Sequence, residues 1–227
     1  MEFLSNADFW IGLVKIVWIN IILSGDNAVV IALAARSLPP EQQKKAIMFG
    51  SGAAVVLRIV LTVVAAKLLE LSFLQVIGGV LLLWIGYQLL SGGEDEEGEA
   101  KGTGSMVAAI RTILIADLVM SLDNVIAVAA TAQGNMVLLI LGLAISIPLV
   151  IFGSTLMIRL MERWPVIITF GAALIGWVGG ETIVNDNLLH AYTEAHPWLH
   201  YTAAAAGAIL VVAVGKYMQS RQAKASD

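Results

Sequence analysis

Long apolar stretches alternate along the chain with short polar ones. A membrane-spanning helix needs roughly 20 predominantly apolar residues, and seven segments approach or exceed that length. They cover residues 10–35, 44–66, 71–90, 107–132, 136–158, 166–184 and 201–218. Proline, glycine and charged residues fill the breaks between them, as loops do. The pattern predicts an all-α, polytopic membrane bundle of seven transmembrane helices.

Composition supports this class. The chain has 227 residues, of which 59% are hydrophobic and only 13% charged, with a mean hydropathy of +0.86. A soluble domain is about half apolar and one quarter charged, so too few polar side chains are present here to cover a soluble surface. The absence of cysteine excludes disulfides, thiolate metal sites and a cysteine nucleophile. The net charge of -4 comes largely from one acidic loop, and we expect no nucleic-acid partner.

One short stretch occurs twice, each time inside an apolar segment. Residues 20–35 read NIILSGDNAVVIALAA and residues 117–132 read DLVMSLDNVIAVAATA. One constant offset pairs Asn20 with Asp117, Ser24 with Ser121, Asp26 with Asp123, and Asn27 with Asn124. A weaker match in the third segment of each half places Gln88 opposite Glu181. The copied polar residues carry the functional argument, because duplication alone is also a simple way to build a bundle.

The duplication predicts four parts. Residues 1–90 form a first three-helix unit, 91–105 a flexible acidic linker, 106–184 a second three-helix unit, and 185–227 an outer loop, a seventh helix and a tail. Three spans per unit is an odd number, so the second unit enters the membrane inverted. Inverted repeats are common in transporters, where the site lies near the midplane between the repeats.

Basic residues predict the orientation. With the N-terminus outside, ten of the thirteen Lys and Arg residues fall in inner loops and helix ends, as the positive-inside rule requires. The beginning of the chain, MEFLSNADFW, lacks the features of a cleaved signal peptide, so we expect the first apolar segment to remain in the mature protein. The expected location is a bacterial inner membrane, with the C-terminus in the cytoplasm.

Carboxylates inside apolar spans are costly. Each costs roughly 2.5–3.5 kcal/mol near the centre of a helix on insertion scales. Asp26 and Asp123 each lie about 16 residues into their segments and Asp117 about ten. Arg58 is the only basic residue deep enough to neutralise one of them. The charge that remains favours a cation site, although a structural ion pair or hydrogen-bonded network stays an alternative.

Helical geometry separates these polar groups. At about 100° per residue, Asn20, Ser24 and Asn27 share one face, and Asp117, Ser121 and Asn124 share another. The two Asp-Asn aspartates point about 120° away from those faces. A helix break at Gly25 would allow Asp26 and Asn27 to act together with freed backbone carbonyls. The second copy has Leu122 at that position, so both a broken and a straight helix stay open there.

The candidate ligands offer oxygen only. They are Ser24, Asp26, Asn27, Asp117, Ser121, Asp123 and Asn124. Glu181 adds a further carboxylate near the outer end of the sixth segment, where an ordinary interfacial glutamate is an equal alternative. Such oxygen donors suit Mg²⁺, Ca²⁺ or Mn²⁺ and disfavour soft ions. Three histidines scattered in the outer loop are a weak metal signal.

The sequence resembles the TerC family of integral membrane proteins, in particular its YjbE-type metal transport subgroup. The resemblance covers essentially the whole chain and rests on SGDNAVVIALAA at 24–35, SLDNVIAVAATA at 121–132 and IGWVGGETIVND at 175–186. The family name comes from tellurium resistance, and its members are similar to manganese exporters. The resemblance implies that Asp26, Asn27, Asp123 and Asn124 are metal-site residues and that Asp117 is an addition. The identity of manganese and the outward direction come from the resemblance alone.

We therefore expect a secondary transporter, not an enzyme, that exports a divalent cation such as Mn²⁺ and needs no resident cofactor. No ATP-binding motif is present, so an ion gradient should drive it. Protons are the natural coupling ion, because carboxylates release protons to bind metal. The expected partners are the metal and the lipid bilayer, with a homo-oligomer left open. Two alternatives are export of a small organic cation or amino acid, and an intramembrane aspartyl protease.

Overall fold

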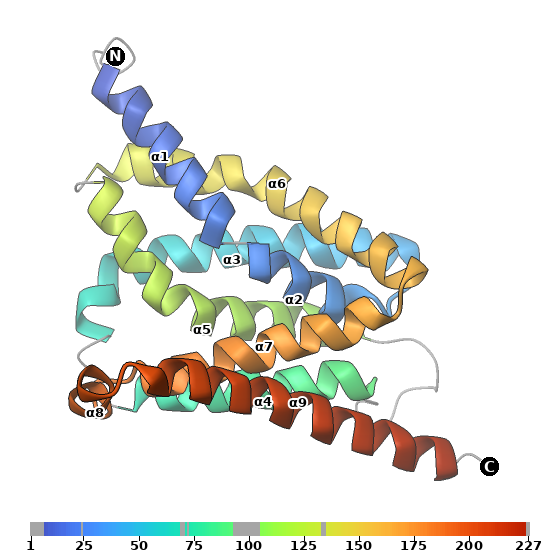
Figure 1. Cartoon of the computed structure of the whole chain (residues 1–227). Helices are drawn as coiled ribbons and strands as arrows, with labels where there is room; N and C mark the ends of the chain where they lie inside the picture. Colours follow the sequence, from blue (N-terminus) through green and yellow to red (C-terminus); the bar gives the residue numbers. More distant parts are fainter. Residues whose placement is uncertain are drawn as a thin grey trace.

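The computed structural model describes residues 7–23, 25–68, 71, 73–92, 105–132 and 135–225. Within them the chain is helical and no strand occurs (Figure 1). The helices are α1 (Ala7–Leu23), α2 (Gly25–Ala35), α3 (Pro40–Leu68), α4 (Leu74–Ser91), α5 (Met106–Ala132), α6 (Met136–Arg163), α7 (Val166–Val184), α8 (His190–Ala195) and α9 (Trp198–Ala225). The acidic linker falls almost wholly outside the described residues.

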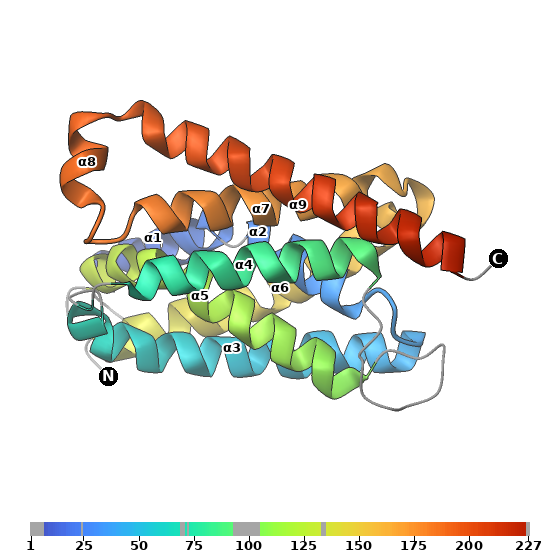
Figure 2. The ribbon, with the colours of Figure 1, turned by 90° about the horizontal axis from the view of Figure 1, so that it is seen from below.

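The long helices lie side by side, with the start of α1 and the end of α9 at opposite ends of the bundle (Figures 1 and 2). Exposed apolar side chains such as Trp18, Phe152 and Phe170 cover the outside, as lipid-facing helices require. Among the described residues, α3, α4, α6, α7 and α9 are long and apolar enough to cross a membrane, and the α1–α2 pair makes six if it is one bent span. The all-α, multi-pass class is confirmed, whereas the count of seven stays a prediction.

The first copy of the repeated motif lies at a helix break. α1 ends at Leu23, α2 begins at Gly25, and the two helices are bent by 49°. Glycine suits this position because a residue without a side chain leaves the backbone free to leave the helix. The second copy lies within α5, which continues without a break from Met106 to Ala132. The break is therefore confirmed in the first unit, and the straight alternative holds in the second.

Small residues set the closest helix contacts. Ala46, Gly50 and Ala54 form a stripe of small residues along α3. A Cβ on Gly50 would lie 3.0 Å from Ile113 of α5, so this stripe faces α5. A Cβ on Gly79 of α4 would lie 2.5 Å from the backbone oxygen of Gly179 in α7. α7 packs against α9 in the same way, through Gly176. These contacts hold α4, α7 and α9 backbone to backbone, as small residues do in membrane helices.

Asp186 joins the start of α4 to the end of α7. This fully buried carboxylate accepts hydrogen bonds from the backbone N–H groups of Phe73, Gln75, Val76 and Leu188, at 2.9–3.3 Å. Burial by itself raises the pKa of a carboxyl group, but the four N–H donors outweigh it and hold the pKa of Asp186 below its usual range. Phe73 adopts a left-handed φ of 69°, so the carboxylate also stabilises a strained turn.

The observed helices differ from the predicted segments mainly at their ends. α6 continues to Arg163 and α9 runs from Trp198 to Ala225. A hydropathy window ends where the residues turn polar, whereas the backbone hydrogen bonds of a helix continue beyond the lipid. The short helix α8, between α7 and α9, was not predicted.

Candidate functional site

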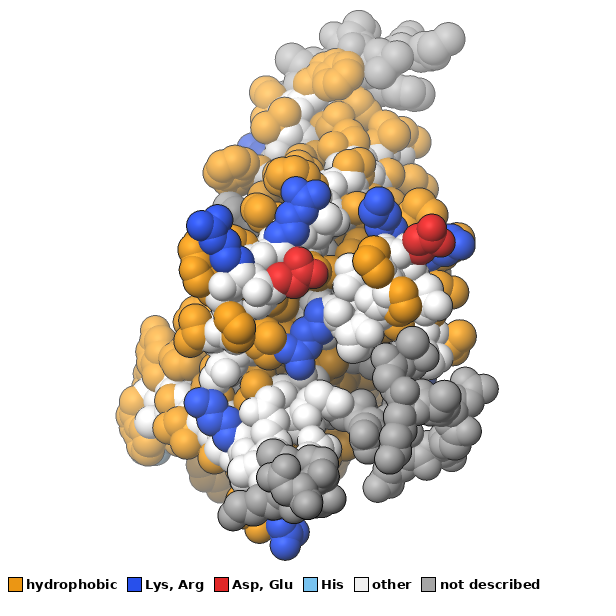
Figure 3. Space-filling model, turned by 90° about the vertical axis from the view of Figure 1, so that its right-hand side faces the viewer, with side chains coloured by type: hydrophobic (Ala, Val, Ile, Leu, Met, Phe, Trp, Pro, Cys, Tyr) orange, Lys and Arg blue, Asp and Glu red, His pale blue; other side chains and the backbone are white. Residues whose placement is uncertain are grey.

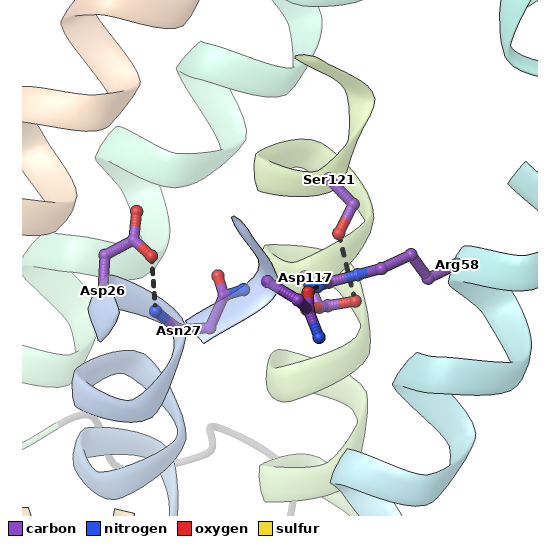
Figure 4. A network of polar contacts seen from close by, with 6 residues as sticks. Asp26, Asn27, Arg58, Asp117 and Ser121 are labelled. Carbon is purple, nitrogen blue, oxygen red and sulfur yellow. Dashed lines mark hydrogen bonds and ion pairs between the residues drawn. The ribbon is translucent and has the colours of Figure 1, made fainter. Parts of the chain in front are cut away.

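A buried polar cluster joins three helices in the middle of the bundle. Arg58 of α3 donates from Nη2 to Asp117 Oδ1 of α5 at 2.5 Å, and from Nη1 to Asn20 Oδ1 of α1 at 2.7 Å. Ser121 Oγ, one turn beyond Asp117, donates to its other oxygen at 3.3 Å. All four residues are at most 6% exposed. Figure 4 shows Arg58 reaching from α3 to Asp117.

The helix faces explain why these groups meet. Gly50, Ala54 and Arg58 follow one another at four-residue intervals, so they lie along one face of α3. Ile113 and Asp117 share a face of α5 in the same way. Because Gly50 lets Ile113 approach closely, the two faces pack together and the guanidinium reaches the carboxylate. The small-residue stripe thus positions the ion pair.

A cavity opens beside this ion pair. Its polar lining comes from Asn20, Asn27, Ser51, Arg58, Asp117 and Ser146, which belong to α1, α2, α3, α5 and α6. The volume open to the centre of a water-sized sphere is about 20 Å³. By this measure one water molecule needs roughly 10–15 Å³. The cavity therefore accommodates one small ion or one water molecule, but not a larger solute.

Asn27 has no side-chain partner among the described residues. Its Oδ1 and Nδ2 atoms are both buried and make no hydrogen bond, and the same is true of Ser51 Oγ. An unsatisfied buried polar group costs about 1–3 kcal/mol, so such groups usually have a ligand or another functional reason. Because Asn27 and Ser51 both line the cavity, their oxygens are available to whatever enters it.

Asp26 is directed differently from Asn27. Its Oδ1 accepts the backbone N–H of Asn27 at 2.8 Å, in the first turn of α2, and the side chain is only half-buried. Asn27 lies between Asp26 and Asp117 in Figure 4. The structure thus brings Asn20 and Asn27 to one cavity and leaves Asp26 to one side of it. The break at Gly25 is present, but it does not bring Asp26 and Asn27 to one cavity; within α2 the two side chains stay separated, as the helical period predicts.

The remaining candidate residues lie in several places. Ser24 lies outside the described residues, as does the side chain of Asp123. Asn124 is half-buried on α5. Within the part of the chain that the structure describes, no group of three or more His, Asp or Glu side chains is arranged to hold a metal ion. The site is therefore an oxygen-lined cavity beside Asp117, whose carboxylate is paired with Arg58, and not a ring of acidic ligands.

Glu181 does not join this cluster. It lies in a second pocket between α7 and α9, lined by Trp177, Glu181, His200 and Tyr201 together with Pro197 and Ala204. Within the described part of the chain, the Glu181 carboxylate makes no hydrogen bond or ion pair. Glu181 lies near the C-terminal end of α7, and the surrounding aromatic and histidine side chains could not be foreseen from the sequence.

Sequence reasoning missed two cavity residues. The sequence did not indicate Ser51 as a site residue, because a serine in an apolar helix usually bonds to its own backbone. Ser146 of α6 is buried and donates to the carbonyl of Gly142 at 2.8 Å, and it also lines the cavity. One signal was available, since Ser51 lies seven residues before Arg58 and therefore on the same face of α3.

Comparison with known proteins identifies relatives. Residues 5–223 match the integral membrane protein TerC family. The chain is 47% identical over 189 residues to the uncharacterized membrane protein YjbE of Bacillus subtilis, covering 83% of this chain and 86% of YjbE. It is 27% identical over 198 residues to the UPF0053 inner membrane protein YoaE of Escherichia coli, covering 79% of this chain but only 38% of YoaE. No solved structure matches the chain.

Proposed function

Since the chain belongs to the TerC family of integral membrane proteins, we propose that it is a secondary transporter that exports divalent metal cations, with Mn²⁺ as the favoured cargo. The observation that carries the proposal is the buried cavity at Asn27. It offers amide and hydroxyl oxygens without partners next to a carboxylate, inside a lipid-facing bundle. Hard divalent cations prefer such oxygens.

The size of the cavity bears on the competing functions. At about 20 Å³ it has room for a bare ion but not for an amino acid or an organic cation. An aspartyl protease needs two carboxylates that share a proton, whereas Asp117 is paired with Arg58. The structure of the site thus supports metal transport over both alternatives.

The proposal includes two inverted repeats of three spans. The packing of the helices supports it, because α3 of the first half packs against α5 of the second, and α6 of the second half packs against α1 and α2 of the first. α4 and α7, the third members of each half, pack against each other. This exchange of partners is what a two-fold axis in the membrane plane would produce. The seventh span, α9, covers α4 and α7.

We place the C-terminus in the cytoplasm of a bacterial cell, with the chain in the inner membrane. Lys and Arg side chains gather on the face of the bundle that carries the end of α9 (Figure 3). The basic residues near the helix ends of this face are Arg36, Lys44, Lys45, Arg111, Arg159, Arg163, Lys216 and Arg221. Positive residues favour the cytoplasmic side, and the relative YoaE is named an inner membrane protein.

In the proposed site, Asn27 and Asp117 meet the cargo from the two repeats. Asp26 is one residue from Asn27 and follows the break, so a rotation of α2 would turn it toward the cavity. Ser24, Ser121, Asp123 and Asn124 complete the duplicated set, and Glu181 serves the outer mouth. Export is coupled to protons, because a carboxylate that takes up a proton releases its metal.

Uptake of Mn²⁺ into inverted membrane vesicles tests the proposal. We expect wild-type uptake to need a pH gradient and to exceed that of Zn²⁺. Mutation of residues that only hydrogen-bond to a metal ligand changes metal affinity by about 10–100-fold. We therefore expect Asp26→Asn and Asp123→Asn each to lower uptake by about tenfold or more. Glu194→Gln is the matched control, because Glu194 is exposed on α8 and its carboxylate lies against exposed His190 of the same short helix.

Membrane insertion of each variant is measured alongside transport. Wild-type Mn²⁺ uptake by a normally inserted Asp26→Asn or Asp123→Asn variant would show that the duplicated aspartates are not the site. Vesicles of the wild-type protein that accumulate no divalent cation would refute the function itself.

A further inference from the structure

Arg58 bridges the two positions that the duplication makes equivalent. The offset that aligns the repeats pairs Asn20 with Asp117, and both side chains accept a hydrogen bond from the same guanidinium. One member of the pair is a neutral amide and the other a carboxylate. The single positive charge of Arg58 therefore balances the single negative charge of Asp117.

A transported cation and Arg58 need the same carboxylate. Asp117 Oδ1 is engaged by Arg58, and Oδ2 accepts from Ser121. The cavity that borders Asp117 is also lined by Arg58 itself. Two like charges a few ångströms apart in a dry interior repel each other strongly, so a divalent cation cannot occupy the cavity while the guanidinium stays on Asp117.

We propose that Arg58 is an internal competing cation, which occupies Asp117 when no cargo is bound and leaves it when the cargo enters. The proposal rests on the metal transport function proposed above. It assigns Arg58 a positioning role: the side chain does not bind the metal, but it forms the ion pair with Asp117 between transport events. It also explains how Asp117 stays charged in the membrane without cargo, since an unpaired buried carboxylate is strongly disfavoured.

The position of Asn20 connects this exchange to the helix break. Asn20 lies near the end of α1, three residues before α1 ends at Leu23. Through Arg58, α1 and α3 are linked to α5. When the guanidinium leaves Asp117 it remains bonded to Asn20, so binding of cargo breaks the polar link from α5 to α1 and α3. Such a link between site occupancy and helix contacts is what alternating access requires.

Equilibrium binding of Mn²⁺ to the purified full-length chain tests the exchange. Loss of the electron paramagnetic resonance signal of hydrated Mn²⁺ reports binding directly. Allosteric and competitive couplings of this kind typically amount to 5–150-fold, so Arg58→Gln should bind Mn²⁺ about tenfold more tightly than the wild type. In inverted vesicles the same variant should show a lower KM and a lower kcat, because tightly held cargo leaves slowly.

Three further variants make the test specific. Arg159→Gln removes an exposed arginine on α6 and should leave binding unchanged. Arg58→Lys keeps the positive charge but loses the two-pronged contact with Asn20 and Asp117, so its affinity should lie between those of the wild type and Arg58→Gln. It serves as the readout if Arg58→Gln does not fold. Arg58→Gln combined with Asp117→Asn should not bind more tightly, because the contested carboxylate is gone.

The outcomes separate this inference from the function on which it rests. If the wild type exports Mn²⁺ while folded Arg58→Gln and Arg58→Lys bind it no more tightly, Arg58 is only a structural partner and the inference is overturned. If neither the wild type nor any variant binds or exports Mn²⁺, the proposed function fails, and the inference fails with it.

Discussion

The ion pair in the middle of the bundle allows a quantitative test through Asp117→Asn. This change removes one negative charge and keeps the size of the side chain. Arg58, only 4% exposed, then stays buried without its counter-charge. Breaking a buried ion pair by removing one partner typically costs 3–5 kcal/mol. The amide oxygen can still accept a hydrogen bond from the guanidinium, so we expect the free energy of unfolding to fall by about 3 kcal/mol, at the lower end of this range.

The matched comparison removes both charges. In the double variant Arg58→Met with Asp117→Leu, apolar side chains of similar volume replace the pair. Such replacements are often neutral or stabilising by about 1–4 kcal/mol, so this variant should be at least as stable as the wild type although it should not transport metal. The result would show that residues 58 and 117 are needed as charges for transport and not for the stability of the fold.

Unfolding in mixed micelles with increasing SDS measures these differences. The six tryptophans supply the fluorescence signal, and the absence of cysteine removes oxidation as a complication. A variant in which an exposed residue is changed, such as Arg159→Gln, shows how much the measured free energy of unfolding varies without a change in the core. If Asp117→Asn unfolds within 0.5 kcal/mol of the wild type, a change typical of surface substitutions, Arg58 and Asp117 do not form a buried ion pair and the assignment of the cluster is wrong.

Two further predictions concern the hydrogen bonds of Asp186 and the close contact between α4 and α7. Asp186→Asn should lower the free energy of unfolding by about 2 kcal/mol, because charged hydrogen bonds to the start of α4 are lost. The folded pKa of Asp186 lies below its usual value of 3.8, so the carboxylate stabilises the wild type fully above that pH, and this stabilisation is lost as the pH falls through the folded pKa. The free energy of unfolding of Asp186→Asn should not show this loss at low pH. If both proteins show the same dependence of stability on pH, Asp186 does not stabilise the fold as a carboxylate. Gly79→Ala should destabilise the α4–α7 contact by about 1–3 kcal/mol, because its Cβ would lie 2.5 Å from the oxygen of Gly179. Gly52→Ala, which meets no atom within 4 Å, is the control, and equal unfolding curves for the two alanine variants would contradict the close approach.

The membrane class and the helical elements could be predicted because they depend on local properties. Apolar length alone indicates that a segment prefers lipid. Each predicted segment corresponds to one helix in the structure, except residues 10–35, which form α1 and α2. The break between α1 and α2 was also foreseeable, because Gly25 is a residue type that permits it. The division of Asn27 and Asp26 onto different sides followed from the 3.6-residue period of the helix.

The partner of each polar side chain was decided by the packing of the helices. The sequence indicated that Arg58 could neutralise one aspartate, but not that it would choose Asp117 and bind Asn20 as well. That choice depends on Gly50, which brings α3 close to α5. Likewise Glu181 shares a pocket with His200 because α7 and α9 pack together, and the carboxylate of Asp186 reaches the start of α4 across more than 100 residues of chain.

The sequence by itself determined a helical membrane protein with a duplicated polar motif, a flexible point in the first copy, and the face of each helix on which the polar groups lie. Only the tertiary structure decided which faces meet, and with them the cavity at Asn27 and the bridge through Arg58. The physical reason is that hydropathy and helical period act over a few residues. A contact between helices depends on how closely their backbones approach, and small residues distant in sequence determine that distance.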